Sequence, residues 1–219
     1  MSMIETIGTT RPLRNLTGRT YLLVAAILGT FALFVLAWAY PTFPGDESVL
    51  LRFQSFRTGW LDEIAKVLAD FGVVWVFLPV IGVLMGFLLL TSRFADAAMV
   101  FAGLFVIGIG NGLKMVVARP RPDYQIFDPF QSSLSFPSGH SLLAVILGGL
   151  LIYLIESWVK PVMLRRAIQA GLVLIVIAMG ASRVYIGVHW PSDVIGSYTF
   201  GILALVGLVG LRNAVSSAP

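Results

Sequence analysis

Six long apolar stretches dominate the chain, and its charged residues lie between them. The stretches are Tyr21–Tyr40, Phe71–Ser92, Ala97–Leu113, Ser141–Ile155, Ala167–Ser182 and Val194–Leu211. About 20 apolar helical residues cross the ~30 Å hydrocarbon core of a bilayer; the first two stretches reach that length, and polar ends can extend the others. None shows the strict alternation of a membrane-barrel strand. The pattern predicts an all-α polytopic membrane protein with six transmembrane helices.

The composition agrees with a membrane protein. The 219 residues are 58% hydrophobic and 12% charged, whereas soluble domains are about 25% charged. The chain has no cysteine, which excludes disulfides, thiolate catalysis and cysteine-based metal sites. A cleaved signal peptide is an alternative for the first stretch, because Ala37–Trp38–Ala39 resembles a cleavage site. Its apolar core exceeds the usual length of about 7–15 residues, which favours an uncleaved helix.

Residues 41–70 differ from the apolar stretches. They begin with a break at Pro41–Thr42–Phe43–Pro44–Gly45. Apolar residues then recur at three-to-four spacing, with charges between them: Val49, Leu50, Phe53, Phe56, Trp60 and Ile64. This predicts one or two amphipathic helices on the outer membrane interface, with a connecting loop as the alternative. We expect one domain over 1–219, with 1–20 as a cytoplasmic segment and a catalytic region over 114–193.

The Lys and Arg residues set the expected orientation. With a cytoplasmic N-terminus, the inside segments carry Arg11, Arg14, Arg19, Arg93, Lys160, Arg165, Arg166 and Arg212. The outside segments carry Arg52, Arg57, Lys66, Lys114, Arg119, Arg121 and Arg183. The excess is eight to seven, or eight to three if the four cations of the candidate site are set aside. We therefore expect a multi-pass plasma (inner) membrane protein with both termini in the cytoplasm.

Two polar clusters lie between the third and fourth stretches. Lys114, Arg119 and Arg121 are three cations within eight residues, and each Arg precedes a proline. They indicate either an anion site or a basic patch on lipid headgroups. Further on, Phe136–Ser141 reads FPSGHS, in which Pro137 and Ser138 mark a helix start. Backbone N–H groups around Gly139 and His140 then form an anion cradle, or Ser138 is a simple cap.

The third cluster is Ser182–Asp193, SRVYIGVHWPSD. His189 lies in the short link before the last stretch, and Asp193 follows four residues later. A carboxylate at that distance can bind one imidazole nitrogen and leave the other free as base or nucleophile. A purely structural His–Asp pair is the alternative. In the six-helix topology, both histidines, Arg183 and the other cations reach the same side, which favours a phosphate site.

Three motifs in these clusters resemble those of the type 2 phosphatidic acid phosphatase family, which is related to vanadium-dependent haloperoxidases. They are K-x6-R-P at Lys114–Pro122, P-S-G-H at Pro137–His140, and S-R-x5-H-x3-D at Ser182–Asp193. The resemblance implies that His189 attacks phosphorus, Asp193 orients it, and His140 is the general acid and base. It also implies that Lys114, Arg121, Arg183, Ser138 and Gly139 bind the phosphate. Arg119 lies outside the motif and is a secondary candidate.

We therefore expect a lipid phosphatase with a phospho-histidine intermediate and an extracytoplasmic site. The candidate substrates are a polyprenyl diphosphate (as in undecaprenyl diphosphate phosphatase), phosphatidic acid and phosphatidylglycerophosphate. The expected partners are a lipid phosphate and the bilayer, with no nucleic acid, no cofactor and no metal, because the acidic residues form no evident magnesium cluster. The alternatives are a lipid phosphotransferase with the same site and a lipid transporter with a vestigial site.

Overall fold

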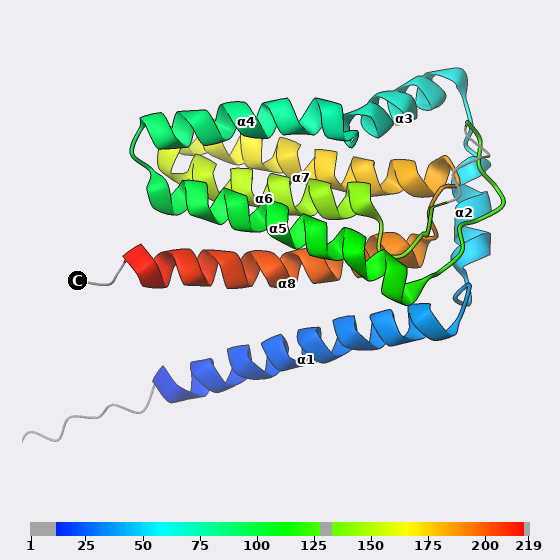
Figure 1. The fold of residues 1–219 in the computed structure, drawn as a ribbon, viewed down its shortest axis with the longest axis horizontal. Helices are drawn as coiled ribbons and strands as arrows, with labels where there is room; N and C mark the ends of the chain where they lie inside the picture. Colours follow the sequence, from blue (N-terminus) through cyan, green and yellow to red (C-terminus); the bar gives the residue numbers. More distant parts are fainter. Residues whose placement is uncertain (1–11, 128–132, 217–219) are drawn as a thin grey trace, which may run out of the picture.

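The computed structural model describes residues 12–127 and 133–216, and every regular element within them is an α-helix (Figure 1). The helices are α1 (Pro12–Ala39), α2 (Asp46–Gln54), α3 (Gly59–Phe71), α4 (Val74–Leu90), α5 (Phe94–Val117), α6 (Gly139–Trp158), α7 (Val162–Tyr185) and α8 (Pro191–Ser216). The all-α prediction is confirmed for this part of the chain.

The long helices form a bundle in which α6 is central. It packs against α5, α7 and α8, while α4 packs on α5 and α1 packs on α5 and α8. The core between α4, α5 and α6 is aliphatic, with Leu88, Val100, Ile146 and Leu150 buried. Lipid tails are as apolar as these side chains, so within a bilayer their close packing stabilises the bundle mainly through van der Waals contact. Many other apolar side chains face outward, as is typical of a protein surrounded by lipid.

Five helices are long and apolar enough to cross a membrane, and they coincide with five of the six stretches found in the sequence. The remaining stretch corresponds to α4, which reaches this standard only together with α3, across a bend of 58°. The bend lies at Gly72 and Val73, where neither residue belongs to a helix. The chain is therefore a multi-pass membrane protein with five or six candidate spans.

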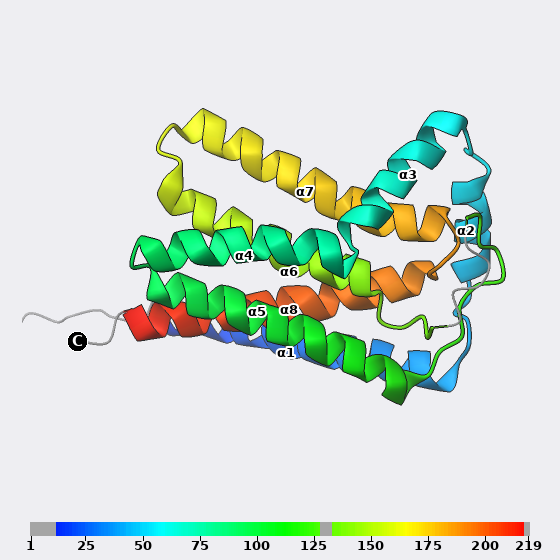
Figure 2. The same cartoon turned by 45° about the horizontal axis from the view of Figure 1, so that its top comes forward.

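Residues 41–70 contain two helices, α2 and α3, and α2 lies across one end of the bundle (Figures 1 and 2). Its packing partners are α7 and α8, whereas α3 packs on α7. The same end of the bundle holds the end of α5, the start of α6, the end of α7 and the start of α8. The described chain begins and ends at the opposite end. The connections that carry the three sequence motifs thus lie together at the end of the bundle that α2 crosses.

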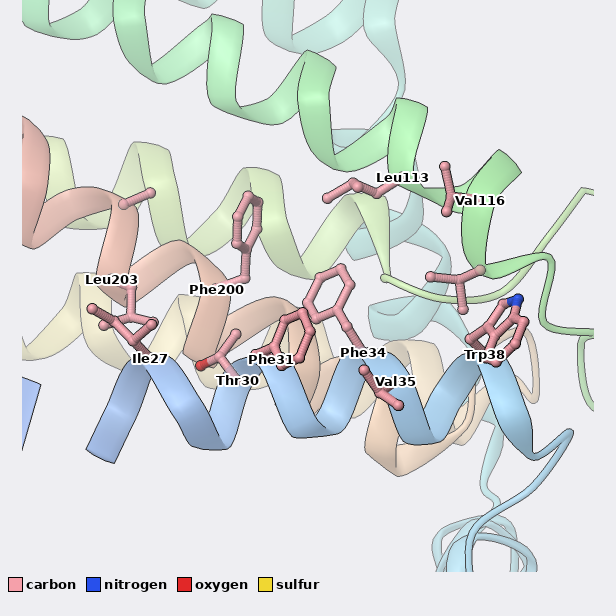
Figure 3. A pocket seen from close by; sticks show the side chains of 12 residues that line it. Ile27, Thr30, Phe31, Phe34, Val35, Trp38, Leu113, Val116, Phe200 and Leu203 are labelled. Carbon is pink, nitrogen blue, oxygen red and sulfur yellow. The ribbon is translucent and has the colours of Figure 1, made fainter. Parts of the chain in front are cut away.

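The helix α5 separates two cavities of different character. One, of about 570 Å³, lies between α1, α5 and α8 and is almost entirely apolar (Figure 3). Phe31, Phe34, Val116 and Leu203 are among the side chains that line it. The other faces α4, α6 and α7 and has polar lining residues at the end of the bundle beneath α2. Among the described residues, none lines both cavities, so the polar cavity is separate from the apolar one.

Candidate active site

The polar cavity has a volume of about 400 Å³ and is lined by residues from each of the three motifs. Six of the sequence-predicted site residues line it: Lys114, Arg121, Gly139, His140, Arg183 and His189. Ser138, Asp193 and Arg119 are buried outside this lining. Motif residues up to 75 positions apart, Lys114 and His189, therefore meet, and the two imidazoles of the chain share one cavity.

A helix-terminating turn places His189 in the cavity. After α7, the Gly187 N–H donates to Val184 O at 3.0 Å and the Val188 N–H to Arg183 O at 3.2 Å. This pair of bonds is a Schellman motif, which requires a left-handed residue just after the helix. Gly187 has φ +74° and meets that requirement without steric cost. The chain thus leaves α7 sharply, and Pro191 begins α8 only two residues after His189.

The carboxylate of Asp193 contacts the edge of the His189 imidazole at Nδ1. The His189 Nδ1 atom lies 3.3 Å from Asp193 Oδ2, and both side chains are buried. Asp193 Oδ2 also accepts the Trp190 backbone N–H at 2.9 Å. This second bond satisfies a free N–H at the start of α8 and fixes the carboxylate. With Nδ1 occupied, Nε2 is the imidazole nitrogen left for chemistry.

Arg121 lies beside that nitrogen. Its Nη1 atom is 3.4 Å from His189 Nε2 and also donates to the carbonyl of Val188. Nε and Nη2 donate to the backbone and side-chain oxygens of Ser133 at 2.6 and 2.8 Å. The guanidinium is therefore held in one orientation by its own loop and by the link between α7 and α8. Burial lowers the pKa of Arg121, an effect that the charge of Asp193 opposes.

Burial and surrounding cations keep the His189 imidazole neutral. Burial, followed by the charges of Arg121 and Lys114, holds the pKa of His189 well below its usual value of 6.5. A cation in this position favours the uncharged ring, because it repels the imidazolium. Neutral imidazole has a free lone pair on one nitrogen, which is the form that can attack an electrophile.

The start of α6 supplies the second histidine and a set of backbone donors. The Ser138 hydroxyl caps the helix by accepting from Ser141 N at 3.4 Å and from Ser141 Oγ at 2.9 Å. Next to it, a Cβ placed on Gly139 would lie 3.1 Å from Asn111 Oδ1, so this turn packs closely on α5. The His140 Nε2 atom lies 3.0 Å from the carbonyl of Ala69 in α3. The positive end of α6 therefore faces the cavity beside His140.

Arg119 occupies a different place from the other cations. It is buried outside the cavity lining, and its guanidinium donates to Asp193 Oδ1 at 2.6 Å and to Asp46 Oδ2 at 2.8 Å. The side chain of Asp46, at the first position of α2, is buried with it.

The structure also places at or behind this site polar and glycine residues that the motifs do not include, among them Asp46, Gly72, Asn111 and Ser133. Asn111 carried a usable signal, because it is a polar residue inside an apolar stretch and lies one helical turn before Lys114. Ser133 lies in a polar link and Gly72 near the start of the second apolar stretch, and only their contacts distinguish them.

The chemistry of the cavity suits a tetrahedral oxyanion. Lys114, Arg121 and Arg183 bring cations, and α6 brings the N–H groups of its first turn. In the described residues, no group of three or more His, Asp or Glu side chains is arranged to hold a metal ion. One neutral imidazole with a carboxylate behind it and a second imidazole complete the set.

Comparison with known proteins agrees with this arrangement. Residues 95–216 match the family model of the PAP2 superfamily. Phosphatidylglycerophosphatase B of Bacillus subtilis is 30% identical over 179 residues, which are 78% of this chain and 84% of that protein. Undecaprenyl-diphosphatase of Sulfolobus acidocaldarius is 28% identical over 72% of this chain and 76% of that protein. Decaprenylphosphoryl-5-phosphoribose phosphatase of Mycobacterium tuberculosis is 31% identical over 76% of this chain and 91% of that protein.

Solved structures share the fold. The crystal structure of a transmembrane PAP2-type phosphatidylglycerolphosphate phosphatase from Bacillus subtilis matches with a TM-score of 0.73 and 24% identity, over 88% of this chain and 98% of that one. The crystal structure of Aquifex aeolicus LpxE matches with a TM-score of 0.59 and 22% identity, over 77% of this chain and 96% of that one. With the family model covering more than half of the chain and the three motifs meeting in one cavity, this protein belongs to the PAP2 superfamily.

Proposed function

We propose that this protein is a membrane lipid phosphatase that hydrolyses a phosphate monoester or diphosphate through a phospho-histidine intermediate. The observation that carries the proposal is the pairing at His189. Its Nδ1 atom faces the carboxylate of Asp193, while Nε2 lies beside Arg121 in a cavity lined with further cations. A nucleophile held by a carboxylate, with cations around its free nitrogen, fits attack on phosphorus.

The first step forms a bond from His189 Nε2 to phosphorus and breaks the bond from phosphorus to the leaving oxygen. His140 donates a proton to that oxygen, and the alcohol or phosphate leaves. The contact between His140 Nε2 and the Ala69 carbonyl decides which nitrogen of His140 can donate this proton. When both nitrogens of His140 carry protons, Nε2–H donates to the Ala69 carbonyl and Nδ1–H remains for the leaving group.

The second step returns the enzyme to its starting state. His140, now neutral, takes a proton from water as the water oxygen attacks phosphorus. The bond from phosphorus to His189 Nε2 breaks, and inorganic phosphate is released. Asp193 stabilises the positive charge that His189 carries between the two steps.

The cations stabilise the charge on the equatorial oxygens in both steps. Lys114 comes from α5, Arg121 from the following loop, and Arg183 from the last turn of α7. Because they come from separate elements, they can surround an anion instead of contacting one face. Fixed charges aimed at the transition state supply a large part of many rate enhancements, and no metal ion is required for this role.

The substrate class is a lipid phosphate. The cavity combines its polar groups with Val74, Phe77, Ile107 and Leu143, so an apolar chain attached to the phosphate meets apolar side chains. The relatives act, by their names, on phosphatidylglycerophosphate, undecaprenyl diphosphate and a decaprenylphosphoryl pentose phosphate. We propose a polyprenyl diphosphate, phosphatidic acid or phosphatidylglycerophosphate as substrate, bound at the extracytoplasmic face, with both termini in the cytoplasm.

Phosphate release from a lipid panel tests this function. Purified protein in detergent is incubated with each of the three lipids and with a soluble phosphate monoester. The expected result is release from at least one lipid, faster than from the soluble ester, and only residual release with His189→Ala. Equal rates for lipid and soluble esters would contradict lipid specificity. Labelled phosphate recovered in a lipid product, with none free in solution, would show a phosphotransferase instead.

A further inference from the structure

The group of buried charges behind His189 extends beyond the three motifs. Asp193 Oδ2 serves His189 and the Trp190 N–H, whereas Asp193 Oδ1 accepts from Arg119 Nη1 at 2.6 Å. Arg119 in turn donates from Nη2 to Asp46 Oδ2 at 2.8 Å. A continuous chain of contacts therefore runs from the imidazole, through two carboxylates and one guanidinium, to the first residue of α2.

Arg119 is held rigidly between these carboxylates. Besides its two ion pairs, Nε donates to the Pro41 carbonyl at 3.0 Å and Nη1 to Ser192 Oγ at 2.8 Å. The Phe43 ring covers the guanidinium, with its centroid 4.6 Å from Cζ. With these donors directed at protein atoms and the side chain buried, Arg119 is poorly placed to contact a phosphate in the cavity.

Asp46 is equally well anchored. Its Oδ1 accepts the Ser192 backbone N–H at 3.0 Å, and its Oδ2 accepts Ser192 Oγ at 2.6 Å and the Phe43 N–H at 2.9 Å. Ser192 lies in the first turn of α8, directly before Asp193. Asp46 therefore caps the helix that carries Asp193, from a helix 146 positions away in the chain.

The combined charge of Asp46, Arg119 and Asp193 gives these three residues a chemical role. One guanidinium between two carboxylates leaves a net charge of −1 next to an imidazole that becomes positive when it is phosphorylated. Without Asp46, the pair of Arg119 and Asp193 would be neutral overall, and this compensation would be lost. The geometry would loosen as well, because Arg119 would keep only one of its two charged partners.

We propose that Asp46, acting through Arg119, is a positioning residue that fixes the Asp193 carboxylate against the nucleophile His189. The proposal rests on the proposed phosphatase function and adds α2 to the machinery of the site. It gives α2, which lies across the end of the bundle (Figure 1), a part in catalysis as well as in the fold.

A double-mutant cycle on the full-length protein tests the proposal. Asp46→Asn keeps the size of the side chain and removes its charge. We expect a loss in kcat of about tenfold or more, with KM changed by less than about threefold, because the cavity lining is untouched. In an Asp193→Asn background the same change should cost less than about twofold, since its effect passes through Asp193. A merely structural role would lower both backgrounds equally.

Two controls make the outcomes distinct. Glu63→Gln removes an exposed carboxylate of α3 that pairs with Lys66 and should leave kcat unchanged. Should Asp46→Asn fail to fold in detergent, Ser192→Ala removes the hydroxyl shared by Asp46 and Arg119 and should show the same non-additivity with Asp193→Asn. Wild-type kcat in a folded Asp46→Asn protein, or full additivity in the cycle, would overturn the proposal. An inactive wild type would instead overturn the proposed function.

Discussion

The Nδ1 atom of His189 lies 3.3 Å from Oδ2 of Asp193, and the two residues are separated by one turn of backbone that includes the start of α8. This relationship assigns the two imidazole nitrogens different tasks. Nδ1 is committed to the carboxylate, and Nε2 is left beside Arg121 in the cavity. The rate, pH dependence and inhibitor sensitivity of the enzyme should all reflect that division.

Replacement of His189, the proposed nucleophile, should remove nearly all turnover. His189→Ala is expected to lower kcat by about 10³-fold or more, because binding and fixed charges alone leave only residual catalysis. Labelled substrate should leave acid-labile label on the wild-type protein and none on the variant. Orthovanadate, which mimics five-coordinate phosphorus, should inhibit the wild type. A His189→Ala protein that still became labelled would place the nucleophile elsewhere.

The low pKa of His189 predicts activity at mildly acidic pH. Burial lowers this pKa first, and the charges around the ring lower it further: Arg121, Lys114, His140 and Arg183. The carboxylate of Asp193 lies 3.3 Å from Nδ1, and a nearby carboxylate in general favours the charged ring. Because the folded pKa lies below 6.5, the ring stays neutral as the pH falls through 6.5 and gains its proton only at lower pH.

The measurement is the pH profile of kcat/KM, corrected for the ionisation of the substrate. Its acid limb, which reports a group of the free enzyme, should lie below pH 6.5. The same low pKa affects the free energy of unfolding. Above pH 6.5 the ring is neutral in both the folded and the unfolded protein. Below pH 6.5 the ring of the unfolded protein gains a proton first, so the folded state becomes less stable. An acid limb assigned to His189 at 6.5 or higher would contradict the description of its surroundings.

Removal of divalent metals should leave the rate unchanged. Lys114, Arg121 and Arg183 line the cavity, and in the proposed mechanism they take the place of the metal ions that many phosphoryl-transfer enzymes use. Dialysis against a chelator, followed by the lipid phosphatase assay, should give activity within about twofold of the untreated protein. A loss restored by added Mg²⁺ would show that these cations are insufficient.

Much of this arrangement could be predicted from the sequence because the membrane restricts the possible folds. Uncharged stretches of fixed length become helices, and the short links between them must meet at one end or the other of a bundle. The links that carry Arg121, His140 and His189 follow this rule. Their meeting at one end of the bundle therefore follows from the sequence alone.

The contacts made by residues 41–70 could not be predicted in the same way. Their helical periodicity was visible, but periodicity does not say where a helix lies on its bundle. The pairing of Asp46 with Arg119 depends on where α2 packs, and the contact from Ala69 to His140 uses a backbone carbonyl, which any residue possesses. The interface position of this segment stays a prediction, as does the side of the membrane that the site faces.

The close packing of Gly72 against His140 gives a prediction specific to this structure. Gly72 lies between α3 and α4, and a Cβ added there would overlap the His140 ring. Its φ of −86° is open to alanine, so the conflict is with the imidazole and not with the backbone. Gly72→Ala should push the ring away from Ala69 and lower kcat by about tenfold or more, with the protein still folded.

Gly82→Ala and Gly86→Ala on α4 are matched controls, because nothing lies within 4 Å of a Cβ at either position. Phosphate release and thermal unfolding in detergent check the expectation. If Gly72→Ala turned over as fast as the two control variants, the position of His140 against α3 would have no bearing on proton transfer.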